Sequence, residues 1–461
     1  NLAPGKYGIS AVPPPGQGWQ QTSTIEGTKL IDAWVEAGEP PFFAEFGPPG
    51  FHVFIGFIQE FNEIPAGGAT LEGKVVNNHM SRPPDYAFFN GGCFGHTTPW
   101  VGLNDMSVGI GEGIYAAATD DECNFTISNV PDGNYQLVVW DNNLDLIFAF
   151  KGISIVDGEC NTPTGCDLGD VPVFQWFHRQ EHFVYNDLDA DGFYDPADGE
   201  TPILEQAVLI RWRDGTIYQE NVSDPEGLYA FDQVFPFFSW LVNEVDFARF
   251  EATSLTVVVD NGGAVPFTRT VDGIGPEGDV TFGGMTNPQD QTNQSDPACV
   301  FPDCTETADY RVELGPVLTA GFQGFIGQTT GYQWGKRHYA DGENGGVSGI
   351  VFYAITRAED DPEYAAAEPW EPGVPRVEVN LYASLGVTQD GVAVKGTLLN
   401  STTTDSWDDS IPTDCKWGNG ADGPFVFDPD GVDGPIPSTE TDCYDGLRNF
   451  NQVRPAVFDG G

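Results

Sequence analysis

The feature that most constrains this chain of 461 residues is a tight turn that leads directly into an alternating run of apolar and polar residues. It occurs as Pro4 to Val12 and again as Pro131 to Trp140. Such alternation is typical of a half-buried β-strand. Similar runs follow at 69–76, 125–130, 207–212, 228–231, 346–353 and 377–382. The sequence therefore predicts an all-β chain.

Helix-forming patterns are sparse in the sequence. Short helices are expected only at 28–38 and 361–368, where Ala365 to Ala367 favour one locally. The content of 57 Gly and 35 Pro indicates many turns and long loops, as in β-sandwich modules.

An acidic stretch from Asn186 to Glu200 has the spacing of an EF-hand-like calcium loop. The predicted ligands are Asp187, Asp189, Asp191, the carbonyl of Phe193, Asp195 and Asp198, with Gly192 at the sharp turn. The flanking residues favour strands, whereas a calcium sensor needs helices that open and close. We therefore expect a structural Ca²⁺ that stiffens the entrance of a module. The alternative is a solvated acidic turn.

The charge of the chain excludes some partners. Nineteen Lys and Arg residues against 69 Asp and Glu give a net charge of −50, which repels nucleic acid and anionic membranes. Such a charge suits calcium, high salt or life outside the cell. The longest apolar run, Val234 to Val242, is interrupted by Pro236 and is too short to span a membrane.

The cysteines indicate an oxidising compartment, extracellular or at the cell surface. There are eight, an even number, and no Cys-x-x-Cys pair is present. Proximity in sequence favours disulfides 160–166 and 299–304, with 93–123 and 415–443 as the remainder. The cysteines are Cys93, Cys123, Cys160, Cys166, Cys299, Cys304, Cys415 and Cys443.

Several phrases resemble the B-type modules of bacterial serine-aspartate-repeat surface proteins, and the related collagen-adhesin and carboxypeptidase-regulatory-like modules. They are the acidic loop with Ser223 to Phe231, Asn129 to Tyr135, and Gly373 to Tyr382 followed by Thr404-Asp405. The resemblance implies tandem prealbumin-like or Ig-like β-sandwiches used as a stalk or spacer. It also implies that Lys74 can form an isopeptide bond with Asp141 or Asn142, although an ordinary surface lysine is the simpler interpretation.

The expected division follows these phrases: an N-terminal segment at 1–67, sandwiches at 68–170 and 171–263, a loop-rich connection at 264–345, and a third module at 346–461 that stops partway. The segment Pro4 to Val12 looks like the last strand of a module. One hypothesis is that it completes the third module of another copy, which would build a filament. The other is that the chain is a fragment of a longer protein.

The main prediction is a non-enzymatic, calcium-stabilised stalk or filament subunit. A carbohydrate- or protein-binding adhesin is the alternative, because 11 tryptophans offer rings that stack on sugars, although Trp140 and Trp212 fit strand patterns. Candidate glycosylation sites are Asn124, Asn221, Asn293 and Asn400.

A zinc hydrolase is a weaker hypothesis. It rests on His178-Arg179-Gln180-Glu181-His182, which has the His-x-x-Glu-His pattern of zinc proteases. That pattern needs a helix, and the aromatic and β-branched flanks favour a strand, which would hold the two histidines about 13 Å apart. A Gly-x-Gly-x-x-Gly match at 273–278 contains Pro276 and lacks a βαβ context, so we interpret it as a loop.

Overall fold

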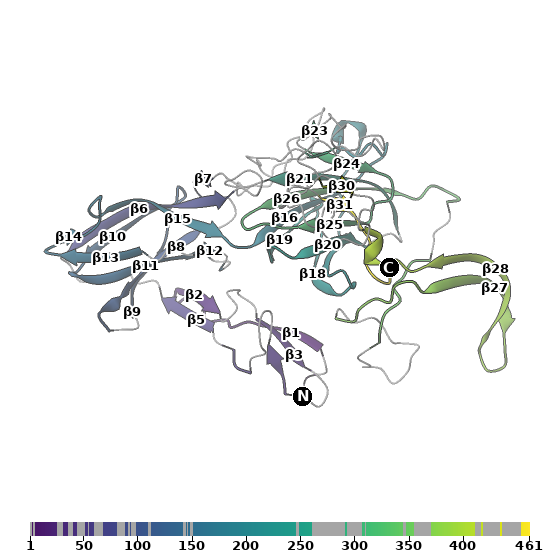
Figure 1. Ribbon diagram of the computed structural model, residues 1–461, viewed down its shortest axis with the longest axis horizontal. Helices are drawn as coiled ribbons and strands as arrows, with labels where there is room; N and C mark the ends of the chain where they lie inside the picture. Colours follow the sequence, from purple (N-terminus) through teal and green to yellow (C-terminus); the bar gives the residue numbers. More distant parts are fainter. Residues whose placement is uncertain are drawn as a thin grey trace.

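A computed structural model of the chain shows two β-sandwiches, two small N-terminal sheets and a projecting two-stranded ribbon (Figure 1). The structure describes residues 2, 5–24, 31–35, 40–43, 51–53, 55–59, 68–80, 88–90, 93, 98–108, 112–141, 144, 146–147, 151–245, 249–260, 291–292, 307–308, 310–343, 347–354, 370–410, 416–417, 434–435 and 453–461. Its regular structure is nearly all strand, so the predicted all-β sandwich class is confirmed.

The first sandwich packs two sheets around one apolar core. One sheet has the order β10-β6-β15-β12, with β7 paired to β6, and the other has the order β14-β13-β11-β8-β9. Leu71 of the first sheet and Leu103 and Val139 of the second are fully buried in the same core. The strands are β6 (Ala69–Met80), β7 (Phe88–Asn90), β8 (Pro99–Asp105), β9 (Glu112–Ala118), β10 (Asn124–Val130), β11 (Gly133–Asp141), β12 (Leu146–Ile147), β13 (Lys151–Val156), β14 (Glu159–Cys160) and β15 (Asp167–Gln175).

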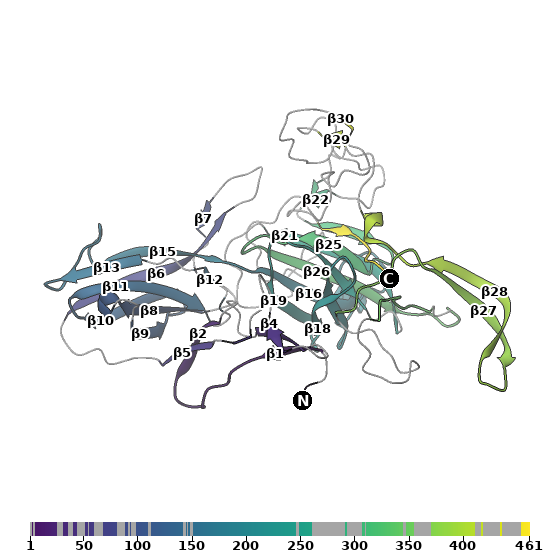
Figure 2. The ribbon, with the colours of Figure 1, turned by 60° about the horizontal axis from the view of Figure 1, so that its bottom comes forward.

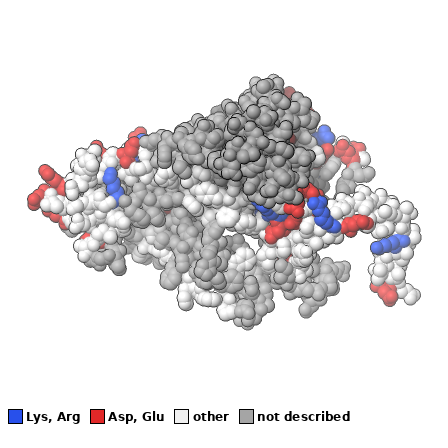
Figure 3. Space-filling model, in the orientation of Figure 1, with Lys and Arg blue, Asp and Glu red and all other residues white. Residues whose placement is uncertain are grey.

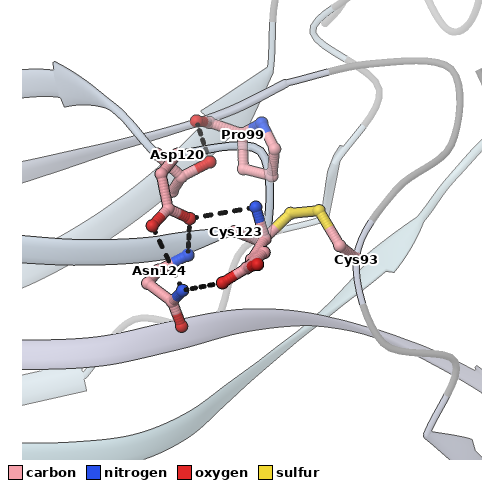
Figure 4. The surroundings of a disulfide bond; sticks show 7 residues. Cys93, Pro99, Asp120, Cys123 and Asn124 are labelled. Carbon is pink, nitrogen blue, oxygen red and sulfur yellow. Dashed lines mark hydrogen bonds between the residues drawn. A yellow bond between two sulfur atoms is a disulfide. The ribbon is translucent and has the colours of Figure 1, made fainter.

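Two disulfides tie this sandwich together. Cys93 bonds Cys123 beside β10, where Asp120 accepts hydrogen bonds from the backbone and side chain of Asn124 (Figure 4). Cys160 bonds Cys166 between β14 and β15. Both bonds confirm predicted pairs. The other four cysteines lie outside the described residues, so pairs 299–304 and 415–443 stay predictions.

The second sandwich follows directly, since only Trp176 and Phe177 separate β15 from β16. Its sheets have the orders β19-β16-β26-β21-β24 and β18-β17-β20-β25-β31. The shared core includes Val184 and Trp334 from the first sheet and Trp240 from the second. The strands are β16 (His178–Asn186), β17 (Ala207–Arg211), β18 (Ile217–Val222), β19 (Leu228–Val234), β20 (Ser239–Glu244), β21 (Phe250–Asp260), β24 (Arg311–Leu314), β25 (Thr319–Gln323), β26 (Thr329–His338) and β31 (Arg454–Pro455).

The second sandwich extends beyond the boundary expected at 263. Its strands β24, β25 and β26 lie within 264–345, where the sequence predicts a loop-rich connection. The central strand β26 contains four glycine and threonine residues within Thr329–His338, and this obscures its pattern. The C-terminal strand β31 also joins this sandwich by pairing with β25. Long-range pairing, rather than local sequence, therefore defines the domain.

The N-terminal segment forms its own small sheets. Strand β1 (Gly5–Ile9) pairs with β3 (Ile31–Val35), which pairs with β4 (Phe42–Phe43), and β2 (Trp19–Thr24) pairs with β5 (Ile55–Gln59). The strand β3 contradicts the helix expected at 28–38. Ile31 and Ala33 are buried two residues apart, the period of a strand. The helix expected at 361–368 lies outside the described residues.

Residues 378–403 form a ribbon rather than part of a third sandwich. Strands β27 (Glu378–Val387) and β28 (Ala393–Thr403) pair with each other along their length. Figures 1 and 2 show the ribbon projecting from the second sandwich, at the opposite end of the molecule from the first. The strand predicted at 377–382 is therefore confirmed, whereas the strand expected at 346–353 is reduced to an isolated bridge from Phe352 to Gly373. Two shorter pairs are β22 (Gln291–Thr292) with β23 (Thr307–Ala308), and β29 (Lys416–Trp417) with β30 (Gly434–Pro435).

Candidate calcium site

The acidic loop leaves the end of β16 and returns to it. The backbone N–H of Asn186 donates to the carbonyl of Thr201 at 2.8 Å, which closes the loop at its base. Asp187, the first predicted ligand, is completely buried, and its N–H donates to the carbonyl of Lys336 on β26 at 2.8 Å. The second sandwich therefore fixes the start of the loop.

The carboxylate of Asp187 is held by two hydroxyl groups of β21. Thr253 Oγ1 and Ser254 Oγ donate to Asp187 Oδ2 at 2.6 and 2.7 Å. The other oxygen, Oδ1, accepts from the N–H of Asp191 at 3.2 Å, inside the loop. Oδ2 thus anchors Asp187 to β21, whereas Oδ1 accepts a hydrogen bond from within the loop.

Glu200 ties the two halves of the loop together. Its Oε1 accepts the N–H of Leu188 at 2.7 Å, and its Oε2 accepts the N–H of Asp195 at 2.8 Å. Ligand atoms of Asp187, Asp189 and Glu200 all lie within 4.8 Å of one another. Glu200 was absent from the predicted ligand set, which ended at Asp198. The signal was present, because Glu200 is the next carboxylate after Asp198 in the acidic stretch.

The structure gives two of the remaining predicted ligands, Asp191 and Asp195, backbone partners within the loop. Asp191 Oδ1 accepts the N–H of Phe193 at 2.9 Å. Asp195 caps the short helix η2 (Pro196–Asp198) by accepting the N–H of Ala197 at 2.7 Å. Asp198 lies on the surface of that helix and is exposed. These groups shape the loop, while the three clustered carboxylates form its centre.

Gly192 makes the turn that the spacing predicted. Its φ is +86°, a left-handed conformation that glycine adopts without strain. A Cβ atom at this position would lie 2.7 Å from Val312 Cγ1 on β24. The carbonyl of Gly192 accepts from Thr256 Oγ1 at 2.6 Å. The turn is therefore pressed against the sheet by both packing and a hydrogen bond.

The electrostatics of the cluster fit a hard cation. Burial raises the pKa of Glu200 to about 7, and the charges of Asp187 and Asp189 act in the same direction against the hydrogen bonds that Glu200 accepts. Burial also raises the pKa of Asp191. Ca²⁺ prefers carboxylate and carbonyl oxygens, and a divalent ion would offset this repulsion. The donor set therefore fits Ca²⁺ at Asp187, Asp189 and Glu200.

The loop lies at the far end of β16 from the link between the sandwiches. The nine residues of β16 separate Asp187 from Trp176 and Phe177, a distance of about 30 Å in an extended strand. The expected position at a module entrance, stiffening the joint, is therefore wrong. The loop instead connects β16, β21 and β26 within one sandwich.

The His-x-x-Glu-His motif lies on β16, as its flanks predicted. His182 stacks between Tyr229 and Tyr332, with ring centroids at 4.5 and 4.7 Å, and its Nδ1 accepts from Trp334 Nε1 at 3.1 Å. Glu181 points to the opposite face of the sheet, where it pairs with Arg179. The strand geometry does not place a glutamate beside two zinc-binding histidines.

The other candidate residues take ordinary structural positions. Lys74 alternates with the core residues Leu71 and Val75 on β6, so it faces away from the sheet that carries Asp141, and no isopeptide geometry is formed with Asp141. Trp140 is buried against Trp100, and Trp212 packs on Trp240 with 36% of its surface exposed. Asn142 lies outside the described residues.

The sequons differ in their surroundings. Asn124 Nδ2 donates to Asp120 at 3.2 Å, and Asn221 Nδ2 donates to the carbonyl of Ala230 at 3.1 Å. Asn400 lies exposed on the ribbon. Asn293 is outside the described residues. A glycan on Asn221 would require that its amide give up a partner inside the sheet.

A buried ion pair links two strands of the second sandwich. Lys336 Nζ lies 2.7 Å from Glu244 Oε1 and donates to Gln206 Oε1 at 3.0 Å, and both charged side chains are 1% exposed. Lys336 follows Tyr332 and Trp334 on the core face of β26. The sequence carries no local sign of this pair, because its members are 92 residues apart.

Comparison with known proteins gives only distant likenesses. No family model matches the chain, and no curated protein does. The shaft pilin SpaA of Lactobacillus rhamnosus GG is 9% identical over 41% of this chain and 91% of its own, with a TM-score of 0.23. A minor pilin of Streptococcus agalactiae is 10% identical over 39% and 84%, with a TM-score of 0.18. The TIE protein of Bacillus anthracis is 10% identical over 87% and 61%, with a TM-score of 0.17. At such TM-scores these likenesses support no argument about this chain.

Proposed function

We propose that this chain is a non-enzymatic structural protein of the cell surface or extracellular space, a calcium-stabilised stalk or filament subunit. The observation that carries the proposal is the acidic loop, where buried Asp187 is hydrogen-bonded to β21 and β26 and lies in one carboxylate cluster with Asp189 and Glu200. A cation at that position stabilises a folded module without needing a moving helix, which suits a load-bearing part.

Two further features support a structural role outside the cell. The disulfides Cys93–Cys123 and Cys160–Cys166 are stable in oxidising compartments. The two sandwiches are joined by a two-residue link, and Figure 1 shows them one after the other along the long axis of the molecule. In the part of the chain that the structure describes, no helix has the length and apolar character needed to cross a membrane.

The experiment is a thermal melt with and without calcium, combined with immunogold labelling of intact cells of the source organism. The proposal predicts a higher melting temperature in calcium and label on the outer surface or on appendages. Label confined to the cell interior would contradict the structural role, and a melt unaffected by calcium would contradict the role of the ion.

The mode of assembly suggested by the sequence needs revision. Strand β1, within Pro4 to Val12, is paired with β3 of its own chain. It is therefore engaged on one edge and is a weaker candidate for completing a neighbouring copy. The third module that it would complete is a ribbon in the described residues.

A further inference from the structure

The ribbon β27–β28 has an apolar face that the described part of the chain leaves open. Alternate residues of β27 are Val379, Leu381, Ala383 and Leu385, an apolar series that ends where the register with β28 shifts before Val387 and Gly386 adopts a φ of +118°. Leu385 and Val387 are 71% and 70% exposed. This alternation normally marks a strand that buries one face. The face therefore has the composition of a buried interface, but its side chains are exposed.

The partner strand also exposes apolar residues, although Leu398 pairs with Tyr382 and so lies on the face opposite to Leu381. Val394, Leu398 and Leu399 of β28 are exposed by 39%, 49% and 62%. An isolated two-stranded hairpin is marginal in water unless its face packs on something. Among the described residues β27 and β28 pair only with each other, so the outer edges of both strands are open as well.

The base of the ribbon is firmly held. Arg376 forms a bidentate ion pair with Asp409 at 3.0 and 2.7 Å. Thr404 donates to the carbonyl of Val374 and accepts the N–H of Val377 at 2.8 and 2.9 Å. Trp407 packs with Phe458 on the second sandwich. The base of the ribbon is thus held to the second sandwich, which limits the orientations of the ribbon and lowers the entropy lost when it binds.

Charge favours a second copy of this chain as the partner. The chain carries a net charge of −50, so two copies repel each other over most surfaces. The ribbon, residues 378–403, carries only Glu378, Asp390 and Lys395. In Figure 3 it appears almost entirely white, with isolated charged side chains. It is therefore a surface on which two acidic copies can meet with little repulsion.

The size of the face also fits a copy-to-copy contact. A ten-residue strand is about 33 Å long, so covering one ribbon face on each of two copies buries on the order of 1,000 Å² in total. That is the lower end of the range for specific protein interfaces, which corresponds to a reversible contact that gains strength when repeated.

We propose that the β27–β28 ribbon is a docking arm whose apolar series, Val379 to Leu385, binds a second copy of this chain. This inference rests on the proposed function in that a structural subunit associates with its own kind. It replaces the N-terminal strand as the element that joins subunits.

The test compares two charge-adding substitutions at neighbouring positions of β27. Leu385→Asp places a carboxylate on the apolar face, and Ser384→Asp places the same charge on the opposite face. Sedimentation equilibrium of the full chain in calcium, from about 1 to 200 μM, measures self-association. The wild-type chain and Ser384→Asp should associate alike, and Leu385→Asp should associate at least tenfold more weakly. Unchanged melting temperatures would show that both variants fold.

Several results would contradict the proposal that the ribbon is a docking arm. A wild-type chain that stays monomeric across this range contradicts it. So does hydrogen-exchange protection of the ribbon in a monomer, which would assign the face to another segment of the same chain. Self-association that is equally strong in Leu385→Asp would contradict the docking role of the ribbon but would not contradict the proposed structural function. The proposed function itself is judged by the calcium melts and by surface labelling, which do not depend on the arm.

Discussion

Replacing Glu200 by Gln distinguishes the calcium ligands proposed from the carboxylate cluster from those that the spacing predicted. The structure places Glu200 with Asp187 and Asp189, and it leaves Asp198 exposed on η2. Glu200→Gln should therefore abolish most of the stabilisation by calcium. Asp198→Asn removes the same charge two residues away and should leave that stabilisation largely intact.

The magnitude follows from mass action. An extracellular-type loop binds Ca²⁺ with a Kd on the order of 10⁻⁴ M, so about 10 mM calcium is roughly 100 times Kd and stabilises the folded state by about 2.7 kcal/mol. For a sandwich of this size, that raises the melting temperature by about 5–11 °C. Glu200→Gln should retain only a small part of the shift.

The assay is differential scanning calorimetry of each variant in calcium and in excess chelator. Each variant is compared with its own chelated state, because Gln at position 200 also loses one acceptor for the amides of Leu188 and Asp195. That loss costs about 1 kcal/mol with or without calcium. An unaltered calcium shift in Glu200→Gln, or its loss in Asp198→Asn, would refute the assignment.

Three further predictions test the packing. Glu244→Gln removes the carboxylate paired with the buried Lys336 and should lower the free energy of unfolding in urea by about 3–5 kcal/mol. Glu251→Gln, in the half-exposed pair with Arg337, should lower it by at most about 1 kcal/mol. Equal losses would contradict the effect of burial. Removing the disulfide Cys93–Cys123 should lower the free energy of unfolding by about 3.6 kcal/mol, and removing Cys160–Cys166 should lower it by about 2.2 kcal/mol, because the closed loops span 30 and 6 residues. The reverse order in denaturant titrations would contradict the loop-entropy argument. Gly192→Ala should lower the melting temperature more than Gly199→Ala. Both glycines have positive φ, but only a Cβ atom at position 192 would contact a neighbour, at 2.7 Å. Equal melting temperatures of the two variants would contradict the tight packing of the turn.

Local patterns predicted the strands well and the pairings poorly. The alternation in 69–76, 125–130 and 207–212 corresponds to β6, β10 and β17. The short segment around Ala33 and Trp34 has no decisive period in the sequence, and its pairing with β1 makes it the strand β3 rather than a helix. The extent of the second sandwich depends on β26 lying beside β16, residues about 150 apart, and no local pattern encodes that contact.

The candidate site was predictable in position but not in its full ligand set. The acidic spacing and Gly192 located the loop. The choice between Asp198 and Glu200 depends on how η2 turns one outward and the other inward, and the hydroxyl groups of Thr253 and Ser254 come from a strand more than 60 residues away. The alternation of β27 is that of a half-buried strand and predicts a sandwich, whereas its apolar side chains are exposed in the structure.

The most direct test of the central claim is an anomalous-difference map from crystals of the full chain grown in calcium. The account predicts one calcium peak in the loop, about 2.3–2.6 Å from carboxylate oxygens of Asp187, Asp189 and Glu200. A loop without a peak at saturating calcium, or an ion held elsewhere without Glu200, would contradict it.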